Sequence, residues 1–333
     1  MLQKLSELDN PDDLLQNILI GNGFSIWFSQ RFNYKTLLEK CEDLFEQDRQ
    51  LFLELKTSNF ETCLSVLNSA SLVNKLYNLE ADHAESYDRI KTSLINVVRK
   101  VHVERSSIPG YRFDQAESLF KKAKNIFTTN YDLLPYWIIL SLKSELKDDQ
   151  FGDAFSYDMN NPKRVSGLYF TEEFRTRRKM FYLHGNLSLF MEGGFIKKIT
   201  NANNQNILSL VEKKINDGTP PLFVSEGTWE LKKTSIESNQ YLRFCFKKFA
   251  RLQGNLTIFG QRLDEQSDNH IIDVIKKSKI NKIAYAMYTA DKLPEEVEHE
   301  KTRINLMFRG KEVLFFDASS LFEYTFDLAF GRL

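Results

Sequence analysis

The sequence predicts an α/β protein in which helices cover both faces of a doubly wound, mostly parallel sheet, with a helical insertion near the N-terminus. Three observations support this class. An apolar run that begins at residue 17 meets Gly-Asn-Gly at 21–23, which is typical of a buried strand ending in a tight turn. Residues 35–105 contain no proline and carry apolar residues at helical spacing. From residue 180 onwards, short apolar strands alternate with helical patterns, which predicts right-handed crossovers between parallel strands.

The N-terminal half supplies the first two strands of this sheet. The run at 17–28 is expected to be a buried strand with its tight turn. Residues 36–105 are expected to be helical and to form an insertion or cap between the first and second strands, either as a lid or as an oligomer interface. The elements expected after the insertion are a helix at 112–124, a strand at 125–130, a helix from near Leu133 and a polar, irregular stretch at 146–180.

The C-terminal half supplies the regular alternation. Strands are expected at 180–185, 220–225, 255–260, 282–288 and 312–318. Helices are expected at 203–217, 238–253, 267–278 and 293–308, with a last helix after the final strand. Residues 1–333 are therefore expected to form a single Rossmann-like domain that contains the insertion.

Composition favours a folded protein without a charge bias. Lys plus Arg number 45 and Asp plus Glu number 45, so no net field favours nucleic acid or an acidic membrane surface. The N-terminus carries charges where a signal peptide needs an apolar core, and no uninterrupted apolar run approaches the ~20 residues of a membrane span. The three cysteines, Cys41, Cys63 and Cys245, include no C-x-x-C pair. We therefore expect no zinc module and no other metal, and a reducing, cytoplasmic location.

Glycine and polar residues follow the predicted strands. Ligands of doubly wound sheets bind beyond the carboxyl ends of the strands, so residues at these positions would share one edge. They are Gly21-Asn22-Gly23-Phe24-Ser25, Thr129-Asn130-Tyr131-Asp132, His184-Gly185-Asn186, Ser225-Glu226-Gly227 and Gly260-Gln261-Arg262.

Each of these pieces has a structural explanation beside its functional one. A Gly-x-Gly turn lets a backbone approach a diphosphate, but most such short turns are only turns. Asp132 can cap the helix that follows it, whereas Asn130 has no comparably simple structural role. The ordinary pKa of histidine, about 6.5, suits His184 to act as a base, although a lone histidine among apolar residues is more often a core residue.

The order of the pieces resembles the sirtuin-like superfamily, in particular its prokaryotic anti-phage defence branch of NAD-consuming effectors. "GNGFS" at 21–25 stands where that family has Gly-Ala-Gly-x-Ser, "TTNYD" at 128–132 stands for Thr-Gln-Asn-x-Asp, and "YLHGN" at 182–186 stands for the histidine motif. Segments 223–242 and 256–275 resemble later parts of the same branch. The resemblance covers most of the chain outside the helical insertion.

The resemblance implies a role for the polar residues at the strand ends. Asn130 would orient a water molecule and the nicotinamide ribose, and His184 would contact the ribose hydroxyls as a base or orienting group. Asp132 would hold the carboxamide of the nicotinamide.

The other candidate residues would bind the rest of the dinucleotide. The resemblance implies that the phosphates lie against Gly21, Gly23 and Ser25. It implies that the adenosine half approaches Gly260 and Gln261. Three further residues are candidates for binding NAD without a more specific role: Asn22, Thr129 and Gly227.

Two departures from the family pattern bear on the substrate. Scattered cysteines cannot build the four-cysteine zinc module of protein-deacylating sirtuins, and "IWFSQRF" replaces the Pro-Asp-Phe-Arg loop that follows their first glycines. Both disfavour acyl-lysine and leave water as the acceptor. The resemblance therefore implies an NAD glycohydrolase that releases nicotinamide and ADP-ribose. It would act in abortive infection once self-association or a defence-system partner activates it.

Two alternatives stay open. The chain could be a non-catalytic NAD-sensing or partner-binding module, since Thr129 stands where the family has glutamine. It could also be a protein deacylase, which stoichiometric zinc would indicate.

Overall fold

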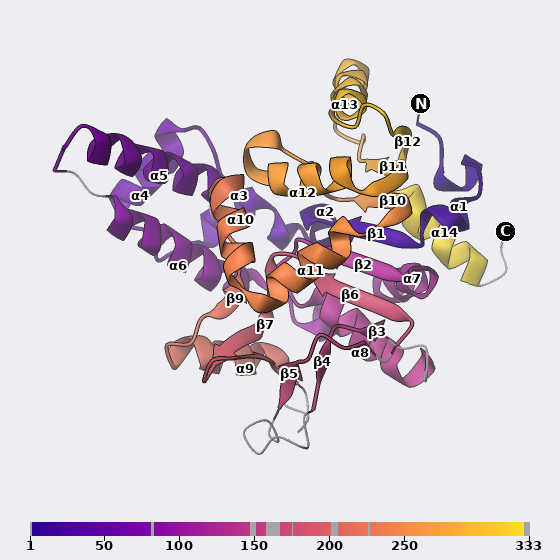
Figure 1. The fold of residues 1–333 in the computed structure, drawn as a ribbon, viewed down its shortest axis with the longest axis horizontal. Helices are drawn as coiled ribbons and strands as arrows, with labels where there is room; N and C mark the ends of the chain where they lie inside the picture. The colour runs from indigo at the N-terminus through magenta and orange to yellow at the C-terminus, as the bar shows by residue number, and fades with distance from the viewer. Residues whose placement is uncertain are drawn as a thin grey trace.

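The protein contains a parallel sheet, a smaller antiparallel sheet and a group of helices that projects beyond them (Figure 1). A computed structural model describes residues 2–80, 83–146, 151–157, 167–174, 176–200, 206–225 and 227–329. Within these ranges, no helix has the length and apolar character needed to cross a membrane.

Among the described residues the larger sheet has seven strands, and every neighbouring pair in it is parallel. Its order across the sheet is β12 (Glu312–Asp317), β11 (Lys279–Met287), β10 (Gln253–Phe259), β1 (Asn17–Ile20), β2 (Asn125–Thr128), β6 (Arg178–Tyr182) and β3 (Phe151–Gly152). The α/β class with a mostly parallel sheet is thus confirmed. The chain leaves β1 toward β2 on one side, whereas β10, β11 and β12 extend the sheet on the other. The strand order therefore reverses between β1 and β10, which is where doubly wound sheets bind ligands.

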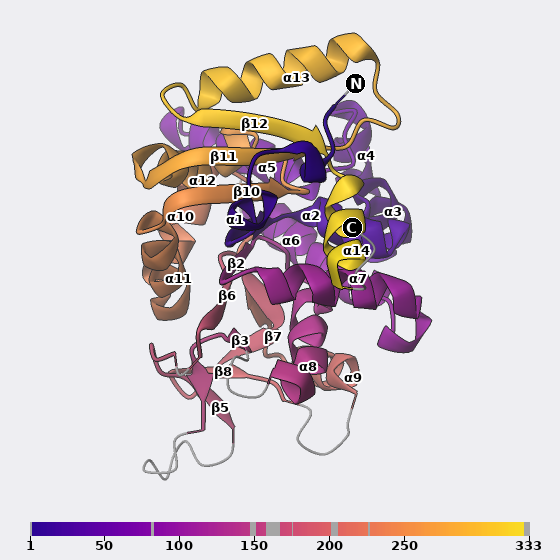
Figure 2. The same cartoon turned by 90° about the vertical axis from the view of Figure 1, so that its right-hand side faces the viewer.

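Helices cover both faces of the parallel sheet (Figure 2). One face is covered by α11 (Gln240–Ala250) and α12 (Glu265–Lys277), and the other by α7 (Gly110–Lys122) and α14 (Ser320–Ala329). Phe127 of β2 packs against Phe249 of α11, with ring centroids 4.9 Å apart. Phe259 of β10 packs against Phe322 of α14 at 5.3 Å. Large aromatic side chains therefore bury the sheet on each side.

The segment between β1 and β2 is helical, as its spacing predicts. A short helix α2 (Asn22–Phe28) follows β1 directly, and the insertion then consists of α3 (Tyr34–Lys40), α4 (Glu46–Glu54), α5 (Phe60–Leu76) and α6 (Ala84–Val101). Asn59 begins α5 by accepting a hydrogen bond from the backbone of Glu61. The insertion is attached to the sheet near His102, whose Nε2 accepts the backbone N–H of Leu133 at 2.8 Å. In Figure 1 α4, α5 and α6 lie beyond one end of the sheet.

The second sheet was not predicted. It has the order β4 (Phe155–Ser156), β5 (Leu168–Phe170), β8 (Phe195–Lys198), β7 (Gly185–Glu192) and β9 (Pro221–Phe223), and its neighbours are antiparallel. The strand expected at 220–225 exists as β9 but belongs to this sheet rather than to the parallel one. A short apolar run predicts only that a strand is buried. It does not predict which strand pairs with it, because tertiary packing decides the pairing. Here the partner is β7, which begins at Gly185 directly after His184.

The remaining elements complete the crossovers. The helix predicted at 293–308 is α13 (Pro294–Met307). The helix predicted at 203–217 is α9 (Ile207–Asn216), and residues 203–205 lie outside the described ranges. An additional helix, α10, precedes α11 where a single helix was expected. The bounds of the helices not given above are α1 (Pro11–Leu14), α8 (Leu134–Leu146) and α10 (Trp229–Ser238).

Candidate functional site at the carboxyl edge of the parallel sheet

Four neighbouring strands bring the sequence-predicted motifs together. The carboxyl ends of β10, β1, β2 and β6 lie next to one another, and backbone hydrogen bonds continue between them beyond the strands. The N–H of Gly21 donates to Phe259, and the N–H of Thr129 donates to Ile20. His184 lies two residues beyond the end of β6. The glycine turns, "TTNYD" and "LHG" therefore occupy one edge of the sheet.

A cavity of about 1360 Å³ opens at this edge. It exceeds the ~300–1,000 Å³ of typical small-molecule sites, so a dinucleotide-sized ligand fits within it. Its walls include all but two of the residues that the sequence singles out: Asn22, Gly23, Thr129, Asn130, Asp132, His184, Gly227, Gly260 and Gln261. Gly21 and Ser25 do not line the cavity, and both are buried behind its wall.

The glycines allow two loops to pack against each other at the floor of the cavity. A Cβ on Gly23 would lie 2.6 Å from the Cα of Gly260, and one on Gly21 would lie 2.1 Å from the Gln261 Oε1. Gly260 also has φ +69°, which side chains rarely adopt. Gly227 allows a third close approach, to the helical insertion, because a Cβ at this position would lie 2.0 Å from the backbone nitrogen of Ser65 in α5. These positions need glycine for protein packing, whichever ligand the cavity takes.

Ser25 fixes the two polar side chains of the "TTNYD" segment. Its hydroxyl donates to Asp132 Oδ2 at 2.5 Å, and it accepts from the Asn130 Nδ2 at 2.7 Å. Asp132 also accepts the backbone N–H of Leu134, so it satisfies the first N–H of α8. Burial raises the pKa of Asp132, while His102 opposes that effect. The bond to Ser25 uses one N–H of the Asn130 amide, so its amide oxygen and its second N–H remain for a ligand.

A second chain of hydrogen bonds fixes Gln261. The Thr129 hydroxyl donates to Gln261 Oε1 at 2.7 Å, and Gln261 Nε2 donates to Asp268 Oδ2 at 2.9 Å. Asp268 lies in the first turn of α12, and its carboxylate also accepts the backbone N–H of Asp264. Burial raises the pKa of Asp268, Lys232 lowers it, and Glu61 raises it further. The orientation of the Gln261 amide is therefore set by the protein from both ends.

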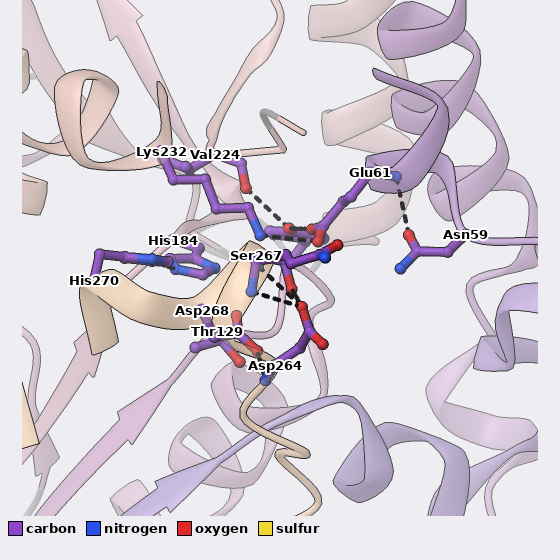
Figure 3. A network of polar contacts seen from close by, with 12 residues as sticks. Asn59, Glu61, Thr129, His184, Val224, Lys232, Asp264, Ser267, Asp268 and His270 are labelled. Atoms are coloured by element: carbon purple, nitrogen blue, oxygen red, sulfur yellow. Dashed lines mark hydrogen bonds and ion pairs between the residues drawn. The ribbon is translucent and has the colours of Figure 1, made fainter. Parts of the chain in front are cut away.

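His184 has a neighbour that the sequence did not indicate as functional. His270 of α12 places its Nε2 2.8 Å from the Nε2 of His184, and both imidazoles are buried (Figure 3). Burial lowers the pKa of His184 well below its usual value, and His270 and Lys232 lower it further. Burial and then Lys232 lower the pKa of His270 to about 3. Both rings are therefore uncharged at neutral pH.

The helical insertion contributes a carboxylate to the same cavity. Glu61 of α5 accepts from the Lys232 Nζ of α10 at 2.8 Å (Figure 3). Glu61 also accepts from the Tyr131 hydroxyl at 3.1 Å. Lys232 is only 1 % exposed, so this ion pair is removed from bulk water. The Tyr131 hydroxyl also lies 2.8 Å from the Val224 carbonyl, so its single proton is shared between these two acceptors. Glu61, Tyr131 and Lys232 all line the cavity together with Asn130 and His184.

Sequence reasoning missed Glu61, Lys232 and His270 for different reasons. Glu61 lies in a helical segment whose spacing indicates only a core-facing stripe. Lys232 precedes Lys233, and adjacent lysines usually indicate a solvated helix face. His270 was within reach of prediction, since it belongs to the 256–275 segment that carries part of the resemblance.

The site combines neutral amide and imidazole groups with the Glu61–Lys232 ion pair and the buried carboxyl groups of Asp132 and Asp268. Asn130, His184 and Gln261 offer amide and imidazole atoms to the cavity, while Glu61 and Lys232 neutralise each other. Within the described ranges, no group of three or more His, Cys, Asp or Glu side chains is arranged to hold a metal ion. These residue types can bind a polyhydroxylated, neutral part of a ligand through donors and acceptors.

Comparison with known proteins places the chain in one family. The model of a family described as "Domain of unknown function (DUF4917)" matches residues 18–322. No curated protein matches the chain. The family match spans the chain from within β1 to within α14 and includes every residue discussed at the cavity. The chain belongs to the DUF4917 family.

Proposed function

We propose that the protein is an NAD glycohydrolase that cleaves NAD to nicotinamide and ADP-ribose. The observation that carries the proposal is the placement of Asn130 and His184 on one cavity, from the ends of the adjacent strands β2 and β6. The cavity has room for a dinucleotide, and it lies where doubly wound sheets bind nucleotides. The sirtuin-like order of the motifs supports the same ligand.

The chemistry of the reaction suits the groups that the cavity offers. Breaking the bond between C1′ of the ribose and the nicotinamide nitrogen sends the bonding electron pair to the nicotinamide. Positive charge then spreads over C1′ and the ring oxygen, and a water oxygen forms the new bond to C1′. The protein must hold the ribose and the water in line, which fixed hydrogen-bonding dipoles accomplish without moving during the reaction.

In this proposal Asn130 and His184 have different roles in holding the ribose and the water. Asn130 is held by Ser25 through its amide nitrogen, so its amide oxygen would accept a hydrogen bond from the attacking water or a ribose hydroxyl. His184 would contact the ribose hydroxyls from the neighbouring strand. Burial of both side chains favours this positioning role, since neither is free to rotate into solvent.

The biological setting of the proposal rests on the resemblance to anti-phage effectors. In that setting the enzyme would be silent in a healthy cell, because unregulated NAD cleavage is toxic. Self-association or a defence-system partner protein would then activate it during infection. The helical insertion, which forms one wall of the cavity through Glu61, is the element best placed to receive such a signal.

Nicotinamide release from NAD tests the proposed function. The purified chain of residues 1–333 is incubated with NAD, and products are separated by liquid chromatography. We expect Asn130→Ala and His184→Ala each to lower the rate by at least about 100-fold, the usual contribution of a positioned polar group. Asn281→Ala and His299→Ala serve as matched controls, since both residues are exposed. Full activity in both site variants would contradict the assignment of the site.

A second function is favoured by one specific observation. Thr129 stands where the resembled family has glutamine, and its hydroxyl is engaged by Gln261 rather than turned to a ligand. A module that binds NAD without cleaving it would tolerate this change. Calorimetry that measures tight NAD binding, together with no nicotinamide release after addition of candidate activators, would favour the binding module over the hydrolase.

A further inference from the structure

His184 and His270 form a pair whose hydrogen bond restricts the chemistry of each ring. Their Nε2 atoms are 2.8 Å apart, the ring planes are inclined by 22°, and the centroids are 5.0 Å apart. Phe246 of α11 also stacks on His270, with ring centroids 5.7 Å apart. Two neutral imidazoles can share this contact only if one Nε2 carries the proton and the other accepts it.

The surroundings of His270 indicate which ring is the donor. The Nδ1 of His270 is buried and has no hydrogen-bond partner among the residues that the structure describes. If Nδ1 carried the proton, a buried N–H would be left without an acceptor, and orphaned buried N–H groups are rarer than under-satisfied acceptors. If Nε2 carries the proton, His270 donates to His184, and its Nδ1 is only an unused lone pair.

The assignment of His270 as the donor determines the tautomer of His184. An Nε2 that accepts from His270 is unprotonated, so the proton of the neutral His184 ring lies on Nδ1. Nδ1 is then the nitrogen that remains for the cavity, which His184 lines beside Asn130. His184 would reach a ligand as a hydrogen-bond donor, and its only basic lone pair would already be occupied.

We propose that His270 is a positioning residue that fixes His184 in the Nδ1–H tautomer, so that His184 donates a hydrogen bond to an acceptor oxygen of the ligand instead of acting as a base. This inference deepens the proposed function and rests on it only for the identity of the ligand, a ribosyl hydroxyl oxygen. The tautomer itself is a property of the protein alone. Phe246 stacks on His270, the ring that donates.

Nitrogen NMR of the full-length chain measures the tautomer directly. The chain has five histidines, so ¹⁵N-histidine labelling gives few signals, and the His184→Ala and His270→Ala spectra assign the pair. In the wild-type protein at pH 7.5, we expect His184 protonated on Nδ1 and His270 protonated on Nε2. In His270→Phe the donor is removed, and we expect His184 to shift to a mixture of tautomers. His270→Gln keeps a donor near the Nε2 position and should restore the Nδ1–H form.

A packing control separates the hydrogen bond from the shape of the site. Phe246→Leu removes the stacked ring but keeps the imidazole donor, so the His184 tautomer should not change. The inference would be overturned by a wild-type His184 protonated on Nε2. It would equally be overturned if the tautomer of His184 stayed unchanged in His270→Phe, since this would leave His270 with no influence on it.

Turnover of NAD is measured on the same variants. We expect kcat/KM to fall at least tenfold in His270→Phe and to recover in His270→Gln. The two proposals fail separately. The expected tautomers in a wild-type protein that neither binds nor cleaves NAD would remove the proposed function and leave the inference about the histidine pair. Efficient NAD cleavage by a protein whose His184 is protonated on Nε2 would do the reverse.

Discussion

Replacing Lys232 by methionine should cost far more stability than a typical lysine substitution. Lys232 is 1 % exposed, and its Nζ lies 2.8 Å from the Glu61 carboxylate, which is itself buried. Removing one partner of such a pair leaves an uncompensated buried charge, at a cost of roughly 3–5 kcal/mol. The Tyr131 hydroxyl still donates to Glu61, so we expect a loss near the lower end, about 3 kcal/mol.

Urea unfolding followed by tryptophan fluorescence and far-ultraviolet circular dichroism measures this loss. The adjacent Lys233→Met is the matched control, because Lys233 lies 3.9 Å from Glu237 and both side chains are more than half exposed. Exposed pairs contribute about 0–1 kcal/mol, so the control should unfold close to the wild type. A loss in Lys232→Met no larger than that in Lys233→Met would refute the reasoning from burial.

The double replacement Lys232→Met with Glu61→Met sharpens the same prediction. It removes both charges, and buried ion pairs exchanged for apolar residues of similar volume are often neutral or stabilising. Tyr131 keeps an acceptor in the Val224 carbonyl. We therefore expect the double variant to recover most of the ~3 kcal/mol lost in Lys232→Met. A double variant at least as unstable as Lys232→Met alone would contradict the assignment of the cost to an uncompensated charge.

Two further predictions concern a glycine and pH. Gly260→Ala should destabilise the protein by about 1–3 kcal/mol more than Gly254→Ala, as measured by urea unfolding. Both glycines have positive φ, but only a Cβ on Gly260 would meet backbone, 2.6 Å from the Phe24 nitrogen. Equal losses of stability in the two variants would contradict this. Lowering the pH from 7.5 to 5.5 should reduce the free energy of unfolding of the wild type by about 1.4 kcal/mol more than that of His270→Phe. The pKa of His270 is about 3 in the folded protein and about 6.5 in the unfolded chain, so its contribution to stability is present above pH 6.5 and is lost as the pH falls. Parallel profiles of stability against pH would show that His270 titrates normally.

The edge of the parallel sheet could be predicted because its signals are local. Gly-Asn-Gly, "TTNYD" and "LHG" each follow an apolar run short enough to be a strand, and parallel strands direct their carboxyl ends to one side. Their adjacency follows from the order β10-β1-β2-β6, in which no other strand separates them. The sequence alone predicts that these turns share an edge, and the fold then brings them onto one cavity.

The opposite wall of the cavity could not be predicted, since it depends on how distant elements pack. Glu61 and Lys232 are 171 positions apart in the chain, and each belongs to a helix whose pattern also fits an ordinary surface. Only the packing of α5 against the loop before α10, where Gly227 meets the backbone of Ser65, buries both charges together. A helical pattern indicates which face of a helix is apolar, but not what that face meets.

The sequence alone allows His184 to act as a base, whereas its surroundings in the structure disfavour that role. An exposed histidine has a pKa near 6.5 and exchanges protons readily at neutral pH. Burial, His270 and Lys232 all act on His184 in one direction and lower its pKa, so it resists the proton that a base would have to accept. A neutral ring held by a second neutral ring is better suited to orient a hydroxyl than to deprotonate it. Catalysis at this site would then depend on fixed dipoles, those of Asn130 held by Ser25 and of His184 held by His270, and any proton released by the attacking water would have to leave through the ligand or the solvent.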